Sequence, residues 1–166
     1  MSVAIQVQTN RSIIGQIPQA PLIDDPYLEP LVQYIYEQLV YAFDPIVIVK
    51  SYRAFNSYQE SLNNYPLLKA YRQSDQYAPN TLWASSVVVI QHCMSYPINS
   101  DLAKYGVQVG NAITQCLLMP DLIEKTKVQL DLSIPVTINY DTQLNANYEP
   151  VMQFVTATCN IYTSAL

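Results

Sequence analysis

The sequence predicts an α+β fold in which a largely antiparallel sheet packs against two helices. Two stretches, 28–43 and 102–117, carry apolar residues at helical spacing, whereas several shorter stretches alternate apolar and polar residues as half-buried strands do. The expected order is one helix, three strands, a second helix and two strands. Consecutive strands favour hairpins, and therefore an antiparallel sheet.

The length of 166 residues suits one domain, and no linker or internal repeat divides it. We expect residues 1–24 to form an extended N-terminal arm and residues 25–166 to form a single domain. Three apolar residues near the start alternate with polar ones, as in one short strand: Val3, Ile5 and Val7. Two prolines farther along the arm, Pro18 and Pro21, exclude a helix there. Such an arm could lie on a neighbouring subunit; in an isolated chain it would more often be a mobile terminus.

The first helix and the first three strands follow the arm. Asp25 is a good N-cap and Pro26 suits the first helical position. An apolar stripe then runs to Phe43, and Asp44-Pro45 ends the helix. The β-branched run 46–49 predicts a strand that continues toward Tyr52, followed by a loop at 54–64. Further strands are expected at 65–72 and 83–94, with a loop at 73–80 between them.

The second half begins with a helix capped by Asn99 or Ser100 and closed by Pro120. Residues 128–134 alternate and predict a fourth strand, with Pro135 at a bulge or edge. A turn is expected at 141–149. The last strand, 151–162, turns one row of side chains to each face, and Phe154 and Tyr162 belong to the same row.

The composition is poor in charge. Only 13% of the residues are charged, against about 25% in typical domains, and the chain contains 14 tyrosines. Tyrosine is enriched at interfaces, where Lys and Glu are depleted, so the surface is expected to face partners. A bias of the source toward amide residues is the alternative. The net charge of −5 disfavours tight nucleic-acid binding, which needs Lys and Arg.

No sequence motif points to an enzyme, a cofactor or a metal. The single histidine, His92, follows a very apolar strand, and its neighbour Cys93 would point to the opposite face, so no catalytic pair is formed. We expect a structural histidine. The three cysteines are expected to be buried and reduced: Cys93, Cys116 and Cys159. No apolar run approaches the ~20 residues of a membrane span, and the N-terminus has no signal-peptide pattern.

One basic cluster stands out. It contains four of the eight basic residues on two strands expected to be neighbours: Lys50, Arg53, Lys69 and Arg72. Between residues 45 and 75 the only acids are Glu60 and Asp75, so we expect the balancing negative charge to come from another subunit, a partner protein or passing DNA. A solvated, charged strand edge is the alternative. Together with three aromatic residues, the cluster forms the candidate interface: Lys50, Arg53, Lys69, Tyr71, Arg72, Phe154 and Tyr162.

The order and size of the elements resemble those of tail-terminator proteins of long-tailed bacteriophages. The resemblance covers about residues 25–163 and rests on the pattern of four segments: PIVIVKSY, YPLLKAYRQSD, ASSVVVIQHCMSYPINSDLAKYGVQVGNAITQCL and EPVMQFVTATCNIYT. It contains no diagnostic motif, and residues 1–24 have no counterpart in it.

The resemblance implies a structural virion protein, assembled in the host cytoplasm, that forms a ring of six copies at the head-proximal end of the tail. Such a ring ends tail-tube polymerisation and binds the head connector, while DNA passes through without specific binding. It implies no catalytic residue and no cofactor. Two alternatives stay open: another neck or head–tail joining protein, and a small adaptor domain with a pocket between helix and sheet.

Overall fold

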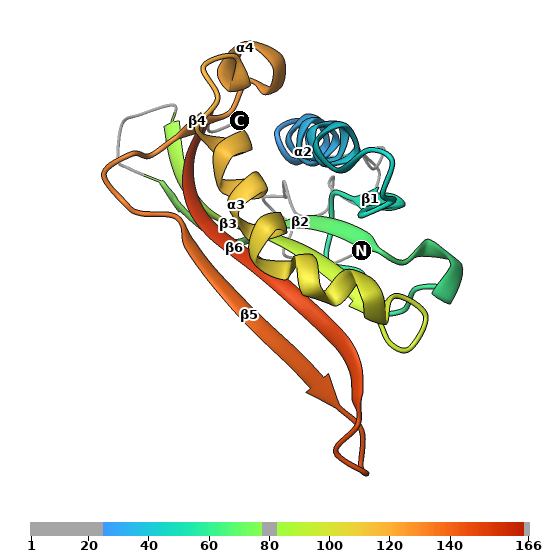
Figure 1. The fold of residues 1–166 in the computed structure, drawn as a ribbon. Helices are drawn as coiled ribbons and strands as arrows, with labels where there is room; N and C mark the ends of the chain where they lie inside the picture. Colours follow the sequence, from blue (N-terminus) through green and yellow to red (C-terminus); the bar gives the residue numbers. More distant parts are fainter. Residues whose placement is uncertain (1–24, 78–82, 165–166) are drawn as a thin grey trace, which may run out of the picture.

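A computed structural model describes residues 25–77 and 83–164, and the expected arm at 1–24 lies outside these residues. The described part is an α+β fold, as predicted (Figure 1). Its helices are α2 (Leu28–Phe43), α3 (Gly106–Leu117) and the short α4 (Leu122–Thr126). Its strands are β1 (Ser51–Arg53), β2 (Leu67–Tyr77), β3 (Trp83–Ser95), β4 (Gln129–Leu130), β5 (Thr137–Leu144) and β6 (Pro150–Ser164). Two 3-10 turns, Leu62–Asn64 and Ser100–Tyr105, complete it.

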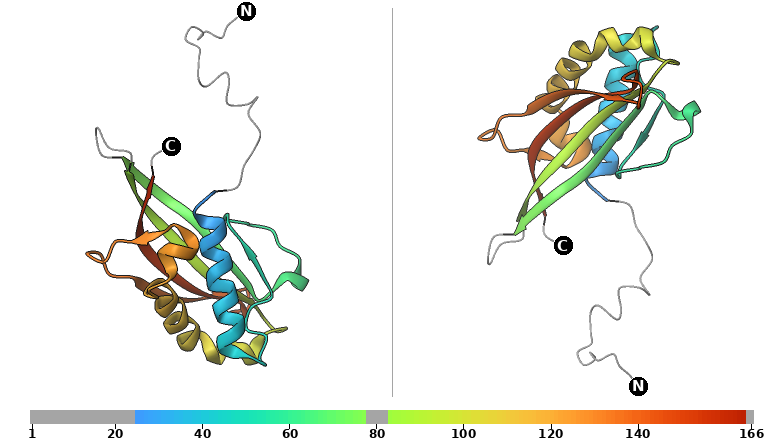
Figure 2. Two further views of the ribbon diagram at one scale, coloured as in Figure 1. Left: turned by 90° about the horizontal axis from the view of Figure 1, so that it is seen from above. Right: turned by 90° about the horizontal axis from the view of Figure 1, so that it is seen from below.

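The strands form one twisted sheet in the order β1-β2-β3-β6-β4, and β5 also pairs with β6. Only β1 and β2 are parallel; the other pairs are antiparallel. The helices lie on one face of the sheet, in front of it in one view of Figure 2 and behind it in the other. Beyond the helices, β5 and β6 continue as a long hairpin (Figure 1), and every residue from 139 to 150 is exposed.

Two strand boundaries in the first half differ from the prediction. Residues 46–49 form a bend and an irregular segment that pairs with no strand, and β1 begins only at Ser51. The apolar run exists because Ile48 and Val49 are buried beneath α2, which a β-branched segment can achieve without a ladder. The expected loop at 73–80 is wrong as far as Tyr77, because β2 continues along β3 after a register shift between Arg72 and Ser74.

The second half holds more structure than predicted. The expected strand at 128–134 shrinks to the two residues of β4, and α4 before it is absent from the prediction. The expected turn at 141–149 is wrong over its first part, since β5 runs from Thr137 to Leu144 and the turn follows it. Three strands rather than two therefore follow the second helix.

The start of α2 is fixed as the sequence predicts. The helix is assigned from Leu28, and one carboxylate oxygen of Asp25 accepts hydrogen bonds from the backbone N–H groups of Tyr27 (2.9 Å) and Leu28 (3.0 Å). These are the bonds an N-cap side chain makes. At its other side α2 is tied to α4, because the Tyr34 hydroxyl donates to Asp121 at 2.8 Å.

The core lies between the helices and the covered face of the sheet. Alternate residues of β6, such as Val155, Ala157 and Cys159, belong to this core and lie on the side of the sheet that α3 covers. All three cysteines are buried and free, as expected. Gly110 lets α3 approach β5 closely, because a Cβ at this position would lie 2.7 Å from the Tyr140 hydroxyl oxygen.

His92 is the one ionisable group in this core whose ordinary pKa lies near neutral pH. Its ring is fully buried, and Nε2 lies 2.7 Å from the carbonyl oxygen of Ile48, to which it donates as the neutral tautomer. The bond holds the unpaired segment 46–49 against β3, as expected of a structural histidine, whereas Nδ1 is buried and has no hydrogen-bond partner among the described residues. Burial lowers the pKa of His92 to about 4.

This burial makes stability depend on pH. In the unfolded chain the imidazole takes up a proton near pH 6.5, whereas in the folded chain it does so only near pH 4. Stability should therefore fall as the pH drops from about 6.5, by about 2 kcal/mol at pH 5. Urea unfolding of the parent and of His92→Gln at pH 7, 6 and 5 measures it. His92→Gln should be less stable at pH 7 but almost independent of pH in this range; equal slopes for the two proteins would contradict the assignment.

Candidate functional site

The face of the sheet opposite the helices is the main candidate surface, and we call it the open face. Residues directly opposite each other on antiparallel strands point to the same side. Tyr71 lies opposite Val89, and Val89 lies opposite Thr158, so these three belong to the open face. Its centre is formed by two rows of side chains on β3 and β6: Ser85, Val87, Val89, Gln91, Cys93, Phe154, Thr156, Thr158, Asn160 and Tyr162.

None of these ten side chains carries a charge at neutral pH. The thiol of Cys93 is held neutral because burial raises its pKa to about 12. Most of the others are half-buried by their neighbours on the twisted sheet. Gln91 donates across the strands to the Thr156 hydroxyl at 3.1 Å, which orders the polar side chains. The centre of the open face is thus a neutral mixture of aromatic, hydroxyl and amide groups, whereas charged residues lie at its margins: Arg53 and Lys69 on one side and Asp141 on the other.

The structure brings five of the seven candidate interface residues to this face. Arg53 lies beside Lys69, and Tyr71, Phe154 and Tyr162 share the same side of the sheet. The other two lie elsewhere. Lys50 precedes β1 and is exposed, and Arg72 points to the helix side, opposite Val88. The basic residues therefore do not form a single cluster.

Two of the four basic residues, Arg53 and Lys69, have their hydrogen-bond partners in the loop after β1. Arg53 donates two bonds to Glu60, from Nε at 3.1 Å and from Nη2 at 3.2 Å. Burial alone would raise the pKa of Glu60, but hydrogen bonds from Asn64 and Ser57 and the Arg53 charge outweigh it and hold the pKa below the ordinary value. Lys69 is only 8% exposed, and its ammonium donates to Asn56 and to the carbonyl of Ser57.

Arg72 joins the start of α2 to two strands. Its Nε lies 2.6 Å from one carboxylate oxygen of Asp25, and its Nη1 donates to Asp75 and to the Ser86 hydroxyl, each at 3.0 Å. Burial would raise the pKa of Asp25, but the bond from Arg72 and the two backbone N–H groups hold it below its usual range. The same acids raise the pKa of Arg72 further above its ordinary value, against the effect of burial.

The expectation that the balancing acids come from another molecule is therefore wrong for both arginines. Glu60, Asp25 and Asp75 supply them within the chain. The alternative of a solvated, charged strand edge does not fit Lys69 and Arg72 either, because Lys69 is buried and Arg72 is bonded to Asp25, Asp75 and Ser86. Sequence reasoning missed this because Asp25 and Arg72 are 47 residues apart.

A groove beside Arg72 carries exposed aromatic residues. It measures about 530 Å³, and Tyr71 and Arg72 form part of its lining together with Phe55 and Tyr58. Phe55 is 58% exposed and Tyr58 is 89% exposed, although both are large rings. This groove extends the aromatic character of the open face around the free edge of β2.

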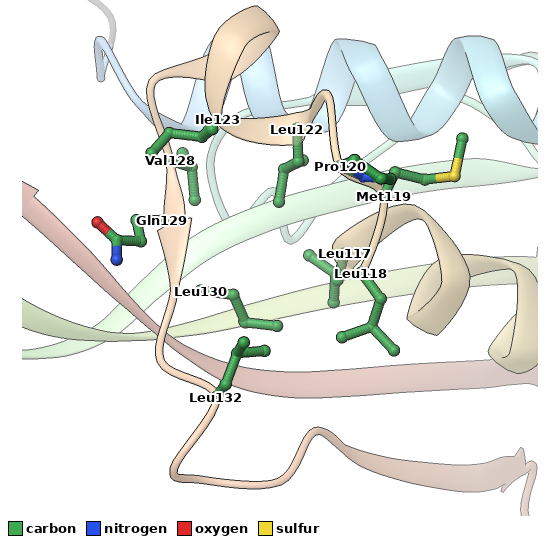
Figure 3. A pocket seen from close by; sticks show the side chains of 10 residues that line it. All are labelled: Leu117, Leu118, Met119, Pro120, Leu122, Ile123, Val128, Gln129, Leu130 and Leu132. Atoms are coloured by element: carbon green, nitrogen blue, oxygen red, sulfur yellow. The ribbon is translucent and has the colours of Figure 1, made fainter.

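A second groove lies at the other end of the molecule, among the end of α3, α4 and β4 (Figure 3). It measures about 370 Å³ and its lining is apolar apart from Gln129: Leu117, Leu118, Met119, Pro120, Leu122, Ile123, Val128, Gln129, Leu130 and Leu132. Leu118 is 57% exposed and Leu132 is 77% exposed. The apolar residues 117–123 are a sequence signal for this groove, but its shape depends on α4, which the sequence pattern does not predict.

No candidate cofactor or metal centre emerges from the described residues, in which no group of three or more His, Cys, Asp or Glu side chains converges. Within residues 25–77 and 83–164, none of the helices combines the length and the apolar character needed to cross a bilayer. No protein-family model and no curated protein matches the sequence. The function is therefore inferred from the residues and surfaces of the chain itself.

Removing the Arg72 charge should destabilise the fold. Arg72→Gln leaves the half-buried Asp25 without its counterion and breaks the link between α2, β2 and β3, so the free energy of unfolding should drop by about 1–3 kcal/mol. Lys50→Gln is the matched control, because Lys50 is exposed and its removal should cost less than about 0.5 kcal/mol. Urea unfolding at pH 7 compares the two. Equal stability of both variants would show that the bonds of Arg72 contribute nothing.

Proposed function

We propose that this chain is a non-catalytic structural subunit that assembles with copies of itself into a ring. The observation that carries the proposal is the open face, where ten central side chains of β3 and β6 are uncharged and include Phe154 and Tyr162. Interfaces are depleted in Lys, Glu and Asp and enriched in aromatic residues, and the centre of the open face has this composition, with Lys69 and Asp141 only at its margins. A solvated sheet face is normally polar, and this face differs in that apolar and aromatic side chains such as Val87, Phe154 and Tyr162 stand among the polar ones.

The same composition extends to other parts of the surface. Several large apolar or aromatic side chains are more than half exposed, for example Tyr41 at 83% and Tyr148 at 84%. Large apolar side chains that are exposed singly are common on protein surfaces, and in this proposal these rings offer further contact points outside the open face. A subunit in the middle of a stack needs contacts with its ring neighbours and with the layers above and below.

On this basis, and following the resemblance in the order of elements, we propose the role of a tail terminator in a long-tailed phage. The ring would sit at the head-proximal end of the tail tube, end its polymerisation and bind the connector of the head. The net charge of −5 suits a channel through which DNA passes without being held. A neck or head–tail joining protein would need the same surfaces and belongs to the same proposal.

One observation favours a second candidate, a small adaptor domain. The apolar groove of about 370 Å³ between α4 and β4 has the size and lining of a site for an apolar ligand or peptide. An adaptor would bind its ligand there as a monomer. Ring assembly therefore distinguishes the two candidates.

Placing charge on the open face should prevent assembly. Thr158 and Asn160 are neighbours on the same side of β6, and two lysines there would have to be desolvated in any interface. We expect the purified parent to form particles of about six times 18.8 kDa, with a ring shape in negative-stain images. The double variant Thr158→Lys/Asn160→Lys should stay monomeric by light scattering and keep the circular dichroism spectrum of the parent.

Gln115→Lys is the matched control for this experiment. Gln115 is exposed on α3, on the helix side of the sheet, so a lysine there adds the same kind of charge away from the open face. It should assemble like the parent. A parent that is monomeric at every concentration, or a double variant that assembles normally, would contradict the proposed use of the open face.

A further inference from the structure

The outer edge of β5 is the least protected part of the described structure. Residues Thr137–Leu144 pair with β6 on one side only, and their register is regular until a shift between Gln143 and Leu144. Natural proteins guard a free edge with charged side chains, above all Lys, or with Pro, a bulge or a covering element. β5 contains neither Lys nor Pro, Asp141 is its single charged residue, and six of its residues in a row, from 139 to 144, are exposed.

The free edge of β2 is better guarded. Its register is broken between Arg72 and Ser74, in the middle of the part that extends beyond β1. Asp75, on the same stretch, is engaged by Arg72 and Ser86. The edge of β5 is therefore the one suited to receive another strand.

Apolar side chains of β5 and of the α3 region lie along this edge, and we call them the apolar shelf: Ile138, Tyr140, Val107 and Leu118. Ile138 and Tyr140 point to the helix side, where they meet α3 at Gly110. Val107 at the start of α3 and Leu118 just after its end lie about three turns apart. Both lie on the outward side of Gly110, and they are 58% and 57% exposed. A strand added outside β5 would place alternate side chains beneath Val107.

The shelf ends in the apolar groove. Leu130 of β4 lies opposite Ile161, and Thr137 of β5 lies opposite Thr158. Three residues along a strand correspond to about 10 Å, so the groove lined by Leu118 and Leu132 begins close to the start of β5. Edge, shelf and groove form one continuous acceptor along β6.

The chain itself contains a segment with the matching pattern. In residues 3–9, VAIQVQT, apolar Val3, Ile5 and Val7 alternate with Ala and polar residues, which gives a strand one apolar and one mostly polar face. Residues 1–23 carry Arg11 and no acid, whereas the hairpin residues 137–150 carry Asp141 and Glu149 and no base. If the added strand runs antiparallel to β5, the apolar residues Ile13, Ile14 and Ile17 follow toward the groove.

We propose that residues 3–9 of one copy add to the edge of β5 in a neighbouring copy, as a donated strand. Exchange of this kind joins copies head to tail, and such a contact closes into a ring when its rotation permits. It rests on the proposed self-association and adds a second contact between neighbouring copies to that of the open face.

A neighbouring copy is the donor in this proposal, and binding of the segment to its own copy is the alternative that the experiment separates from it. Asp25 is bonded to Arg72 on β2, and β3 and β6 lie between β2 and β5. To reach β5 of the same copy, residues 10–24, which span at most about 50 Å, would have to cross the helix layer or the open face. A neighbouring copy can receive the segment without this crossing.

Two variants of the full chain break the contact from its two sides. Ile5→Lys spoils the donor, and Val107→Lys spoils the acceptor. Each should weaken assembly about tenfold or more, because one apolar side chain loses its burial. Gln6→Lys and Gln108→Lys are the matched controls: each neighbours the changed residue but belongs to the opposite strand face or to the solvent side of α3, and each should assemble like the parent.

A mixture of the two defective variants tests whether the strand is exchanged. The Val107→Lys chain still has an intact donor and the Ile5→Lys chain an intact acceptor, so equal amounts should form dimers that grow no further, as measured by native mass spectrometry. Hydrogen exchange of the β5 amides should slow when these dimers form. If mixing yields no dimers while β5 is protected in the monomeric parent, the segment binds its own copy and the exchange is wrong.

The outcomes separate this proposal from the proposed function. If both variants assemble like the parent, the strand exchange is wrong while ring formation by the open face stands. If the parent never forms rings but the mixed variants form dimers, the exchange stands and the ring is wrong. A peptide of residues 1–17, added in excess to the parent, should reduce assembly; no effect at any concentration would overturn the exchange.

Discussion

The long antiparallel ladder between β3 and β6 determines most of the architecture. Its register runs from Trp83 opposite Ser164 to Ser95 opposite Met152 without a shift. Because the side-chain period of a strand is two, this register decides which residues meet on each face. It gathers Val88, Ile90 and His92 with Cys159, Ala157 and Val155 on one side, and this side is too apolar to be left in water. The helices cover this apolar side. The same register therefore leaves the opposite side of the sheet without a helix.

The positions of the charged residues fit this difference between the covered and the open side of the sheet. The described chain has few charged residues, and several of them are engaged in holding loops and helix ends to the sheet rather than in covering the surface. Arg53 and Glu60 secure the loop after β1, and Arg72 and Asp25 secure the start of α2. Partly buried pairs of this kind are costly to break, because one charge is then left without its partner. The surface that remains is neutral over wide areas, which is why its interactions with other molecules would be driven by apolar, aromatic and amide groups.

The sequence is sufficient for the elements that combine length with a strong pattern. It predicts α2, β3 and β6 closely, since each has one face in the core. It misses most of β5 because both faces of this strand are largely exposed, so that Asp141 looks like a turn residue although it lies within the strand. Residues 46–49 show the converse: burial beneath α2 and the bond from His92 to Ile48 require apolar residues but no strand partner. The ion pairs escape prediction because sequence spacing does not show which elements the sheet brings together. Five of the seven candidate interface residues share the open face because the pairing register brings them to the same side, and sequence alone does not establish that register.

The two edges of the sheet differ, and this difference bears on how copies could associate. A symmetric dimer places the same patch on both subunits, so it could use the β5 edge of each copy. Two β5 strands would then bring Asp141 of one copy near Asp141 of the other, and neither hairpin has a base to balance them. An uncharged strand from elsewhere in the chain avoids this repulsion and offers its own apolar face to Val107. The acidic, base-free hairpin thus disfavours pairing with itself and leaves the edge open to a different segment, which is the requirement for a head-to-tail contact and hence for a closed ring of more than two copies.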